Sequence, residues 1–300
     1  MLKFASIQRV VGALLAWSSL MMQPPAAVAF LYRDGTMNLF LISAAVLLVV
    51  GALIYLPVRD ASRDLRLRDG FLIVVACWLS LALVGALPFV LLEDPELSYV
   101  DAFFESMSGL TTTGATIITR INDLPRGILF YRQQLQWLGG MGIIVLAVAI
   151  LPMLRIGGMQ LYRAETPGPL KDTKLTPRIT ETAKALWLIY LGITVLCTLS
   201  YWLGGMPMFD AVGHAFSTVA IGGFSTHDQS FAYFSNPTLE VVAIIFMVVA
   251  GMNFALHFSA WRKASAQPYF QDSELRAYAV LLVLFSALAT VVLMVDGVYD

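Results

Sequence analysis

The chain has 300 residues, of which 58% are hydrophobic and 13% are charged, and its mean hydropathy is +0.76. Globular proteins average about 45–50% apolar and about 25% charged residues, so this composition excludes an ordinary water-soluble domain and predicts an integral membrane protein. The 19 basic and 20 acidic residues give a net charge of −1, which offers no basic surface for nucleic acid.

The cysteines and histidines form no recognisable metal or redox motif. Cys77 and Cys197 each lie in an apolar run, without a second cysteine nearby, and are expected to pack as small hydrophobic residues. The three histidines are His214, His227 and His257, and their spacing fits no zinc motif.

Seven segments are long and apolar enough, or nearly so, to cross a bilayer as helices, since a core about 30 Å thick requires roughly 20 residues. They are residues 10–30, 37–57, 71–92, 130–153, 182–203, 238–260 and 277–296. Arginine and lysine are concentrated in the connections after the second, fourth and sixth segments, and acidic residues gather on the opposite side. The positive-inside rule therefore predicts a cytoplasmic N-terminus and places these three connections in the cytoplasm.

The N-terminal segment has two interpretations. Lys3 and Arg9 precede an apolar stretch that ends near Ala27, the pattern of a cleavable signal peptide. The same residues also fit a retained first span, in which Pro24 and Pro25 would kink or break the helix near its outer end. The sequence leaves both open.

Two further segments are too apolar for solvated loops and too short to span. Asp101–Thr116 and Asp210–Ser225 each begin with Asp-Ala, continue as a short helix, and break into small residues around a glycine. A constant offset of 109 residues superposes the two aspartates and also superposes Gly114 on Gly223. With their flanking spans, the two segments therefore form a parallel repeat.

The length of these segments requires a turn inside the membrane. A helix of about ten residues covers about 15 Å, half of the bilayer core. Non-helical backbone survives at that depth only where protein buries it or water lines it, so residues 111–116 and 220–225 are expected to form the wall of an aqueous path. Carbonyl groups that glycine turns inward can replace the hydration shell of an alkali cation, and the negative end of each half-helix favours a cation. The predicted cargo is K⁺ or Na⁺ rather than an anion.

These residues resemble the potassium-transporting subunits of the Trk, Ktr and HKT superfamily, and in particular its bacterial Trk uptake subunits. The most specific stretches are Asp101–Thr116, Phe130–Pro152, Gly157–Asp172 and Ile221–Asp228. The resemblance implies an all-α integral membrane fold in which four membrane–pore loop–membrane repeats, similar to those of potassium channels, surround one pore.

The implied division of the chain follows from that architecture. It comprises two preceding helices (1–70), repeat one (71–153), a cytoplasmic loop (154–181), repeat two (182–261) and the first helix of a third repeat (262–300). Because the chain ends directly after this helix, at Asp300, we expect it to be part of a longer protein and to carry half of the filter.

The resemblance also implies a selectivity filter whose K⁺ ligands are backbone carbonyls of two equivalent tripeptides. They are Thr112, Thr113 and Gly114 in repeat one and Ile221, Gly222 and Gly223 in repeat two. It further implies K⁺ as the transported ion with no other cofactor, a location in the bacterial inner membrane, a homodimer, and a cytosolic TrkA-type ring that carries nucleotide-binding domains. The chain itself contains no nucleotide-binding glycine motif.

Three functions are compared. Channel-like potassium uptake would be driven by the membrane potential and needs no ATP site. Obligatory coupling of K⁺ to H⁺ or Na⁺ would require an intramembrane carboxylate relay, for which only Glu105 is available in these spans. An integral-membrane enzyme would need a nucleophile–base pair or a carboxylate cluster, and neither is visible, so the chain is not predicted to be an enzyme.

Several polar residues and glycines each have two interpretations. Glu105 and His214 occupy the same repeat position, where they brace the half-helix or act as titratable gates; bracing is the stronger prediction. Polar residues that open the fourth span tether the filter loop or line a vestibule: Arg132, Gln133, Gln134 and Gln136.

Asn253 and His257, four residues apart on one helical face, border a cavity or form hydrogen bonds between helices. The glycines Gly139, Gly140, Gly142 and Gly251 permit close helix packing or hinge motion.

Overall fold

The computed structural model describes residues 4–61, 67–142 and 179–297. Within these ranges the chain is helical and contains no strand. It divides into two compact units, Met1–Met247 and Val248–Asp300, which are described separately.

Unit 1 begins with an apolar helical segment that covers Phe4–Tyr32. It consists of α1 (Phe4–Ser18), a 3-10 turn (Ser19–Met22) and α2 (Gln23–Tyr32). The prolines predicted to break the span occupy the first turn of α2, where a missing N–H costs little. The second predicted span is α3 (Met37–Tyr55), which continues as a 3-10 turn through Leu56–Val58.

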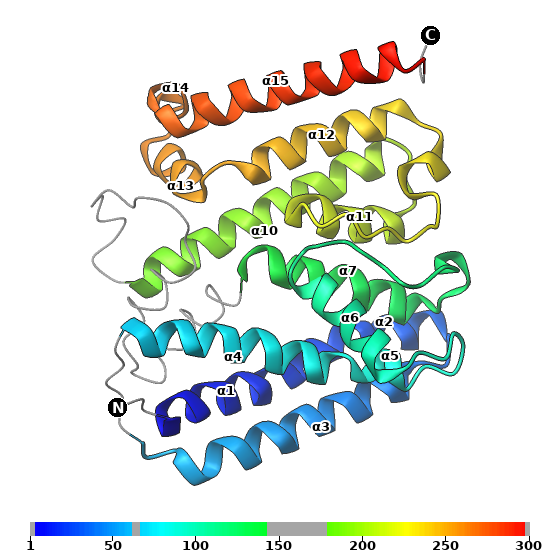
Figure 1. The fold of residues 1–300 in the computed structure, drawn as a ribbon, viewed down its shortest axis with the longest axis vertical. Coiled ribbons are helices and arrows are strands. Elements are labelled where there is room, and N and C mark those ends of the chain that lie inside the picture. The colour runs from blue at the N-terminus through cyan, green and yellow to red at the C-terminus, as the bar shows by residue number, and fades with distance from the viewer. Residues whose placement is uncertain (1–3, 62–66, 143–178, 298–300) are drawn as a thin grey trace. The chain divides into compact units, whose positions relative to one another are not determined.

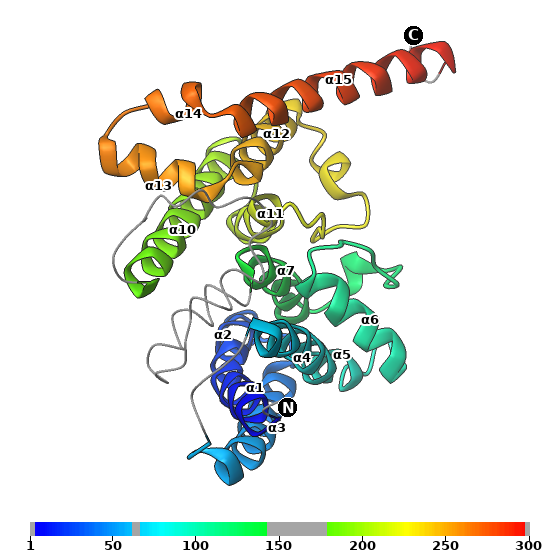
Figure 2. The ribbon, with the colours of Figure 1, turned by 60° about the vertical axis from the view of Figure 1, so that its left-hand side comes forward.

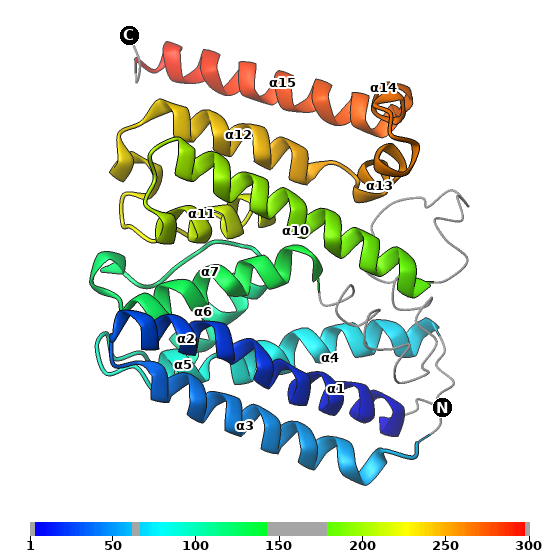
Figure 3. The same ribbon diagram turned by 180° about the vertical axis from the view of Figure 1, so that it is seen from behind.

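Helices α1 and α3 pack with their backbones in contact (Figures 1 and 3). A Cβ atom on Gly12 would lie 2.6 Å from the backbone nitrogen of Tyr55, and one on Gly51 would lie 2.3 Å from that of Ala16. Since real Cβ atoms do not approach so closely, glycine is required at both positions. The first predicted span thus packs closely against the second.

The two segments predicted as repeats each contain a long helix, a short helix and a further helix. Repeat one has α4 (Leu67–Gly85), α5 (Leu87–Val90), α6 (Tyr99–Leu110), a 3-10 turn (Ile121–Asp123) and α7 (Arg126–Gly140). Repeat two has α10 (Ile179–Leu203), α11 (Met208–Ala220), a 3-10 turn (Ser230–Phe234) and α12 (Pro237–Gly251). The second half of the predicted span 130–153, the stretch Gly157–Asp172 and the basic connection around it lie outside the described residues.

The two short helices enter unit 1 from the same end (Figure 1). The turn between α2 and α3 lies at that end, whereas α1, α4 and α10 begin at the other end. Helices α6 and α11 run inward and stop part of the way through. Helix α7 lies between α11 on one side and α6 on the other (Figures 1 and 2).

The predicted span 238–260 is interrupted by a bend. Helix α12 ends at Gly251, and α13 (Phe254–Lys263) starts after a sharp break; α14 (Gln267–Gln271) and α15 (Ser273–Val295) follow. The carbonyl of Val249 accepts a bond from the Met252 N–H at 3.2 Å and contacts Nε2 of His257 at 3.0 Å. The histidine ring thus adds a second partner to a carbonyl in the last turn of α12, where carbonyls lose their usual i+4 N–H donors.

The predicted pairing of Asn253 with His257 on one helical face is wrong for the same reason. Asn253 lies in the break and donates to Oε2 of Glu274 at 3.3 Å. His257 contacts the hydroxyl of Tyr269 through Nδ1 at 2.8 Å. Both residues make hydrogen bonds within unit 2, as one of the two interpretations proposed.

By length and composition, five described helical segments could cross a membrane, and the bent pair α12 and α13 would make a sixth. The five are Phe4–Tyr32, Met37–Val58, Leu72–Val90, Lys184–Leu203 and Ser273–Val295. They match predicted spans in order and in position to within a few residues. The chain is therefore a multi-pass helical membrane protein.

Candidate functional site

The site is built on the two half-helices α6 and α11, which have 12 and 13 residues. At 1.5 Å per residue they are about 18 and 20 Å long, too short to cross a bilayer core of about 30 Å. After each helix the chain continues without regular structure, in two segments called here loop 1 (residues 111–117) and loop 2 (residues 221–226). The expected turns therefore form.

The two loops share one backbone conformation at the predicted offset of 109 residues. Thr112 and its equivalent Ile221 have φ of 54° and 53°, and Gly114 and its equivalent Gly223 have φ of 74° and 87°. Positive φ is routine for glycine but costly for β-branched residues such as threonine and isoleucine. The strained first position was not predicted, and its occurrence in both loops shows that the local fold imposes it.

Equivalent hydrogen bonds close the two loops. The N–H of Thr113 donates to the carbonyl of Ser108 at 2.9 Å, and Gly222 donates to Ser217 at 2.8 Å. Each of these serines also donates its hydroxyl forward across the loop at 2.6 Å, Ser108 to the carbonyl of Ala115 and Ser217 to that of Phe224. A serine on the last turn of each half-helix thus fixes both ends of its loop.

Loops 1 and 2 touch each other at the glycines. A Cβ atom on Gly114 would lie 1.9 Å from the carbonyl oxygen of Gly222, and no real side chain fits there. In contrast, a Cβ atom on Gly223 would meet nothing within 4 Å. The tripeptides 112–114 and 221–223 are therefore neighbours.

Glu105 and His214, at equivalent positions on the half-helices, both brace the loops. Glu105 accepts bonds from the hydroxyl of Thr116 at 2.9 and 3.0 Å and from the N–H of Ile117 at 3.2 Å. His214 contacts the hydroxyl of Ser225, the equivalent of Thr116, through Nε2 at 3.0 Å. Its Nδ1 lies 2.9 Å from the carbonyl of Asp210, so Nδ1 carries the proton and Nε2 accepts. These contacts agree with bracing, the interpretation favoured from the sequence.

One face of α7 holds both loops. Arg132 is fully buried and contacts loop 1 and loop 2. The side-chain amide of Gln133 contacts the hydroxyl of Ser217, and Oε1 of Gln136 accepts the N–H of Phe224 at 3.0 Å. Of the polar residues expected to tether the filter loop, these three do so. All three belong to repeat one, yet all three contact repeat two, and Arg132 contacts loop 1 as well.

Two adjacent glycines on α7 allow it to approach the ends of both half-helices. A Cβ atom on Gly139 would lie 1.9 Å from the carbonyl oxygen of Leu110, the last residue of α6. One on Gly140 would lie 2.8 Å from Cα of Ala220, the last residue of α11. The close-packing interpretation fits these two glycines. Gly142 has a φ of 67°, and Gly251 is the last residue of α12.

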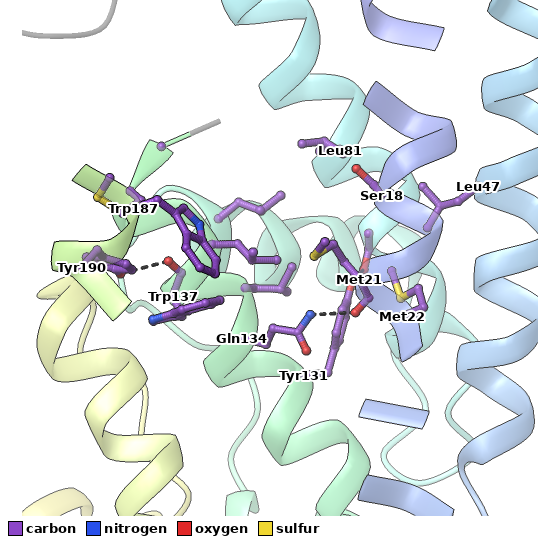
Figure 4. A pocket seen from close by; sticks show the side chains of 16 residues that line it. Ser18, Met21, Met22, Leu47, Leu81, Tyr131, Gln134, Trp137, Trp187 and Tyr190 are labelled. Atoms are coloured by element: carbon purple, nitrogen blue, oxygen red, sulfur yellow. Dashed lines mark hydrogen bonds between the residues drawn. The ribbon is translucent and has the colours of Figure 1, made fainter. Parts of the chain in front are cut away.

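Gln134 points away from the loops and toward the N-terminal helices. Its Nε2 donates to the carbonyl of Met21 at 2.6 Å, at the edge of a largely apolar cavity (Figure 4). Tyr131, Trp137 and Tyr190 also line the cavity, and Tyr190 donates to the carbonyl of Trp137 at 2.9 Å. None of the six predicted filter residues lines this space.

A second contact joins the segments that follow the loops. The carboxylate of Asp228 accepts the N–H groups of Ile121 at 2.8 Å and Asn122 at 3.2 Å. In return, Oδ1 of Asn122 lies 3.1 Å from Nδ1 of His227. The stretch Ile221–Asp228 was noted in the sequence, but this role was not, because only the fold brings residues 121 and 228 together. Across the described residues, no cluster of histidine, cysteine and acidic side chains could hold a metal ion.

Two half-helices that enter a helical membrane protein and turn back through glycine loops define the pore-loop class of membrane proteins. The chain belongs to the TrkH family, because the family model described as "Cation transport protein" matches residues 36–298. It is 55% identical to the "Trk system potassium uptake protein TrkH" of Vibrio parahaemolyticus, over 94% of this chain and 59% of that protein. The corresponding Escherichia coli K12 protein is 52% identical over 99% of this chain and 62% of its own length.

The fold agrees with a solved structure. The crystal structure of the potassium transporter TrkH from Vibrio parahaemolyticus superposes with a TM-score of 0.86 at 48% identity, covering 100% of this chain and 61% of that one. The chain thus spans about 60% of the length of these relatives. They are named as uptake proteins, and the family is one of transporters rather than enzymes.

Proposed function

We propose that this chain forms part of the ion pathway of a bacterial potassium uptake protein, in which loops 1 and 2 supply two of the segments of a selectivity filter. The observation that carries the proposal is the matched pair of loops, with equal backbone angles and with Gly114 against the carbonyl of Gly222. The ligands are the backbone carbonyls of the tripeptides 112–114 and 221–223. Carbonyl rings of this kind replace the hydration shell of an alkali cation. The relatives' names supply the ion, K⁺.

Permeation is channel-like in this proposal. A cation that enters a cell with a negative interior gains about 2.3 kcal/mol per 100 mV, so no ATP site is needed. The alternative, symport with H⁺ or Na⁺, requires a carboxylate that is free to exchange a proton. Glu105, the candidate for that role, is engaged by Arg132, Thr116 and Ile117. This engagement favours channel-like passage over a proton relay.

The setting proposed for this pathway is the bacterial inner membrane, with the N-terminus in the cytoplasm. The family resemblance adds a homodimer and a cytosolic TrkA-type ring with nucleotide-binding domains as partners. The printed name "Trk system" of the relatives is consistent with an assembly of several components.

The test is rubidium uptake by the full-length protein in liposomes, with Gly223 replaced by valine. Because a side chain at Gly223 meets nothing within 4 Å, the substitution acts on the backbone angle rather than on packing. Gly223→Val is expected to lower uptake at least tenfold or to abolish the preference for K⁺ over Na⁺. Gly192→Val is the matched control, since Gly192 lies in α10 with open space around it. Uptake and preference equal to the parent in Gly223→Val would overturn the filter assignment.

A further inference from the structure

The side chain of Arg132 has no exposure to solvent and reaches three different segments. Its Nε donates to Oε1 of Glu105 at 2.8 Å. One terminal nitrogen donates to the hydroxyl of Thr116 in loop 1 at 3.1 Å, and the other to the carbonyl of Ser225 in loop 2 at 3.3 Å. The guanidinium also lies 4.3 Å from the ring centre of Phe224, a cation–π contact.

The two loop contacts fall on equivalent residues of the repeat, on the hydroxyl of Thr116 and on the backbone carbonyl of Ser225. Thr116 and Ser225 are related by the offset of 109 and both follow a filter glycine by two residues. One guanidinium therefore holds the same point of both loops, and it does so from α7, which lies between the half-helices. The offset of 109 places Val241 of α12 at the position of Arg132, so repeat two offers no equivalent guanidinium.

The charge of Arg132 would by itself oppose a cation pathway. A buried, unpaired guanidinium next to the loops would repel a passing ion, and it would also be expensive to bury. Glu105, equally buried, removes the net charge at 2.8 Å. Because Glu105 compensates its charge, the effect of the guanidinium on the loops comes from the directions of its N–H donors, which bind both loops at once.

We propose that Arg132 is a positioning residue that fixes the separation of loops 1 and 2, and that Glu105 neutralises it so that cations can pass. This inference rests on the proposed filter function. The discrimination between K⁺ and Na⁺ then depends on the forked shape of the guanidinium rather than on its charge. Lysine keeps the charge but carries its donors on a single atom, so it cannot reach Glu105, Thr116 and Ser225 together.

The experiment measures two quantities on the full-length protein in liposomes: the K⁺/Na⁺ permeability ratio from reversal potentials, and the thermal midpoint. Arg132→Lys is expected to lower the ratio about tenfold while the thermal midpoint stays within a few degrees of the parent. The double variant Glu105→Gln, Arg132→Gln removes both charges and should fold, since no buried charge is left unpaired. Its K⁺/Na⁺ permeability ratio should nevertheless fall, because the forked donor is gone. Gln134→Ala is the control, because Gln134 lies on the same helix and bonds to Met21 instead of a loop.

A parent-like ratio in Arg132→Lys, or in the double variant, would contradict positioning by the fork. Gly223→Val is measured alongside these variants. If the K⁺/Na⁺ permeability ratio falls in Gly223→Val but stays at the parent value in Arg132→Lys, the filter assignment stands and this inference fails. If Gly223→Val also behaves as the parent, the filter assignment itself fails. A loss of ratio in Gln134→Ala would show that any change in α7 disturbs the loops, which would also overturn a specific role for Arg132.

Discussion

Among single residues, the backbone angles of the loops separate what the sequence could predict from what it could not. Glycine at 114 and 223 predicts a turn, because only glycine takes positive φ without a penalty. Thr112 and Ile221 take positive φ against their own preference, since β-branched residues favour extended backbone. The capping bonds from Ser108 and Ser217 decide these angles, and such bonds become visible only in the fold.

Substitution of Gly114 by alanine is expected to be more damaging than substitution of Gly223. Both carry positive φ, but a Cβ atom on Gly114 also collides with the carbonyl oxygen of Gly222 at 1.9 Å. Strain alone costs about 1–2 kcal/mol, and overpacking adds about 1–3 kcal/mol. Thermal unfolding of the purified variants should therefore rank the parent above Gly223→Ala and Gly223→Ala above Gly114→Ala. The opposite order of the two variants would show that the loops do not touch at Gly114.

The carboxylate of Asp228 is expected to stabilise the outer contact between the repeats. Asp228→Asn removes the charge and one of two acceptors for the N–H groups of Ile121 and Asn122, so the variant should lose about 1.5–3 kcal/mol. Asp94→Asn is the matched control, because Asp94 forms an exposed ion pair with Arg120 that should contribute less than about 1 kcal/mol. Chemical unfolding in detergent would measure both. Equal losses in the two variants would contradict a special role for Asp228.

Among the secondary-structure elements, α7 was predicted as part of a span with a polar beginning, and its tether role was one of two interpretations. The spacing of Arg132, Gln133 and Gln136 places them on one helical face, which agrees with a single surface of contact. The identity of their partners depends on where α11 lies, and Gln134, one position along, turns instead to Met21. Sequence spacing can therefore show which residues share a helical face, but tertiary packing decides which residues that face contacts.

The backbone contact between α1 and α3 is expected to fail when its glycines gain side chains. Gly51→Val would force the helices apart, since a Cβ atom there already lies 2.3 Å from the nitrogen of Ala16. A loss of about 1–3 kcal/mol, or failure to accumulate as a folded protein, is expected. Fluorescence-detected size exclusion after heating would measure it, with Gly192→Val as the control in open space. Parent-like stability of Gly51→Val would show that α1 does not pack on α3 at this point.

For the whole molecule, hydropathy and charge predicted most of the spans, because a helix that crosses the bilayer core needs about 20 mainly apolar residues, and such a run is visible in the sequence. The break at Gly251 was missed, since the run 238–260 is uniformly apolar except for Asn253 and His257. At the break, His257 contacts the carbonyl of Val249, and composition carries no sign of that contact. The half-helices were found because their repeat is visible in the residues themselves.

The membrane orientation gives a prediction that cysteine labelling can check. Glu93 and Asp60 are exposed and are predicted to lie on opposite sides, Glu93 outside and Asp60 in the cytoplasm. An impermeant maleimide added to intact spheroplasts should label Glu93→Cys but not Asp60→Cys, which should react only after lysis. The natural Cys77 and Cys197 are buried, so the parent protein should give little background from this part of the chain. Labelling of Asp60→Cys in intact cells would reverse the topology.

The position of α7 also has a consequence for how the chain is made and how it diverges. A ribosome completes residues 126–140 long before residues 221–226, so the scaffold for the later loop is already synthesised when that loop emerges. A tandem of two identical ancestral units would have placed the same helix twice, but here Arg132 and Gln136 serve a neighbour whose own helix has alanine or apolar residues in its middle. The contacts between the two repeats are therefore one-sided, and a chimaera that exchanges only repeat two with that of a distant relative should lose the contacts that Arg132 and Gln136 make with loop 2.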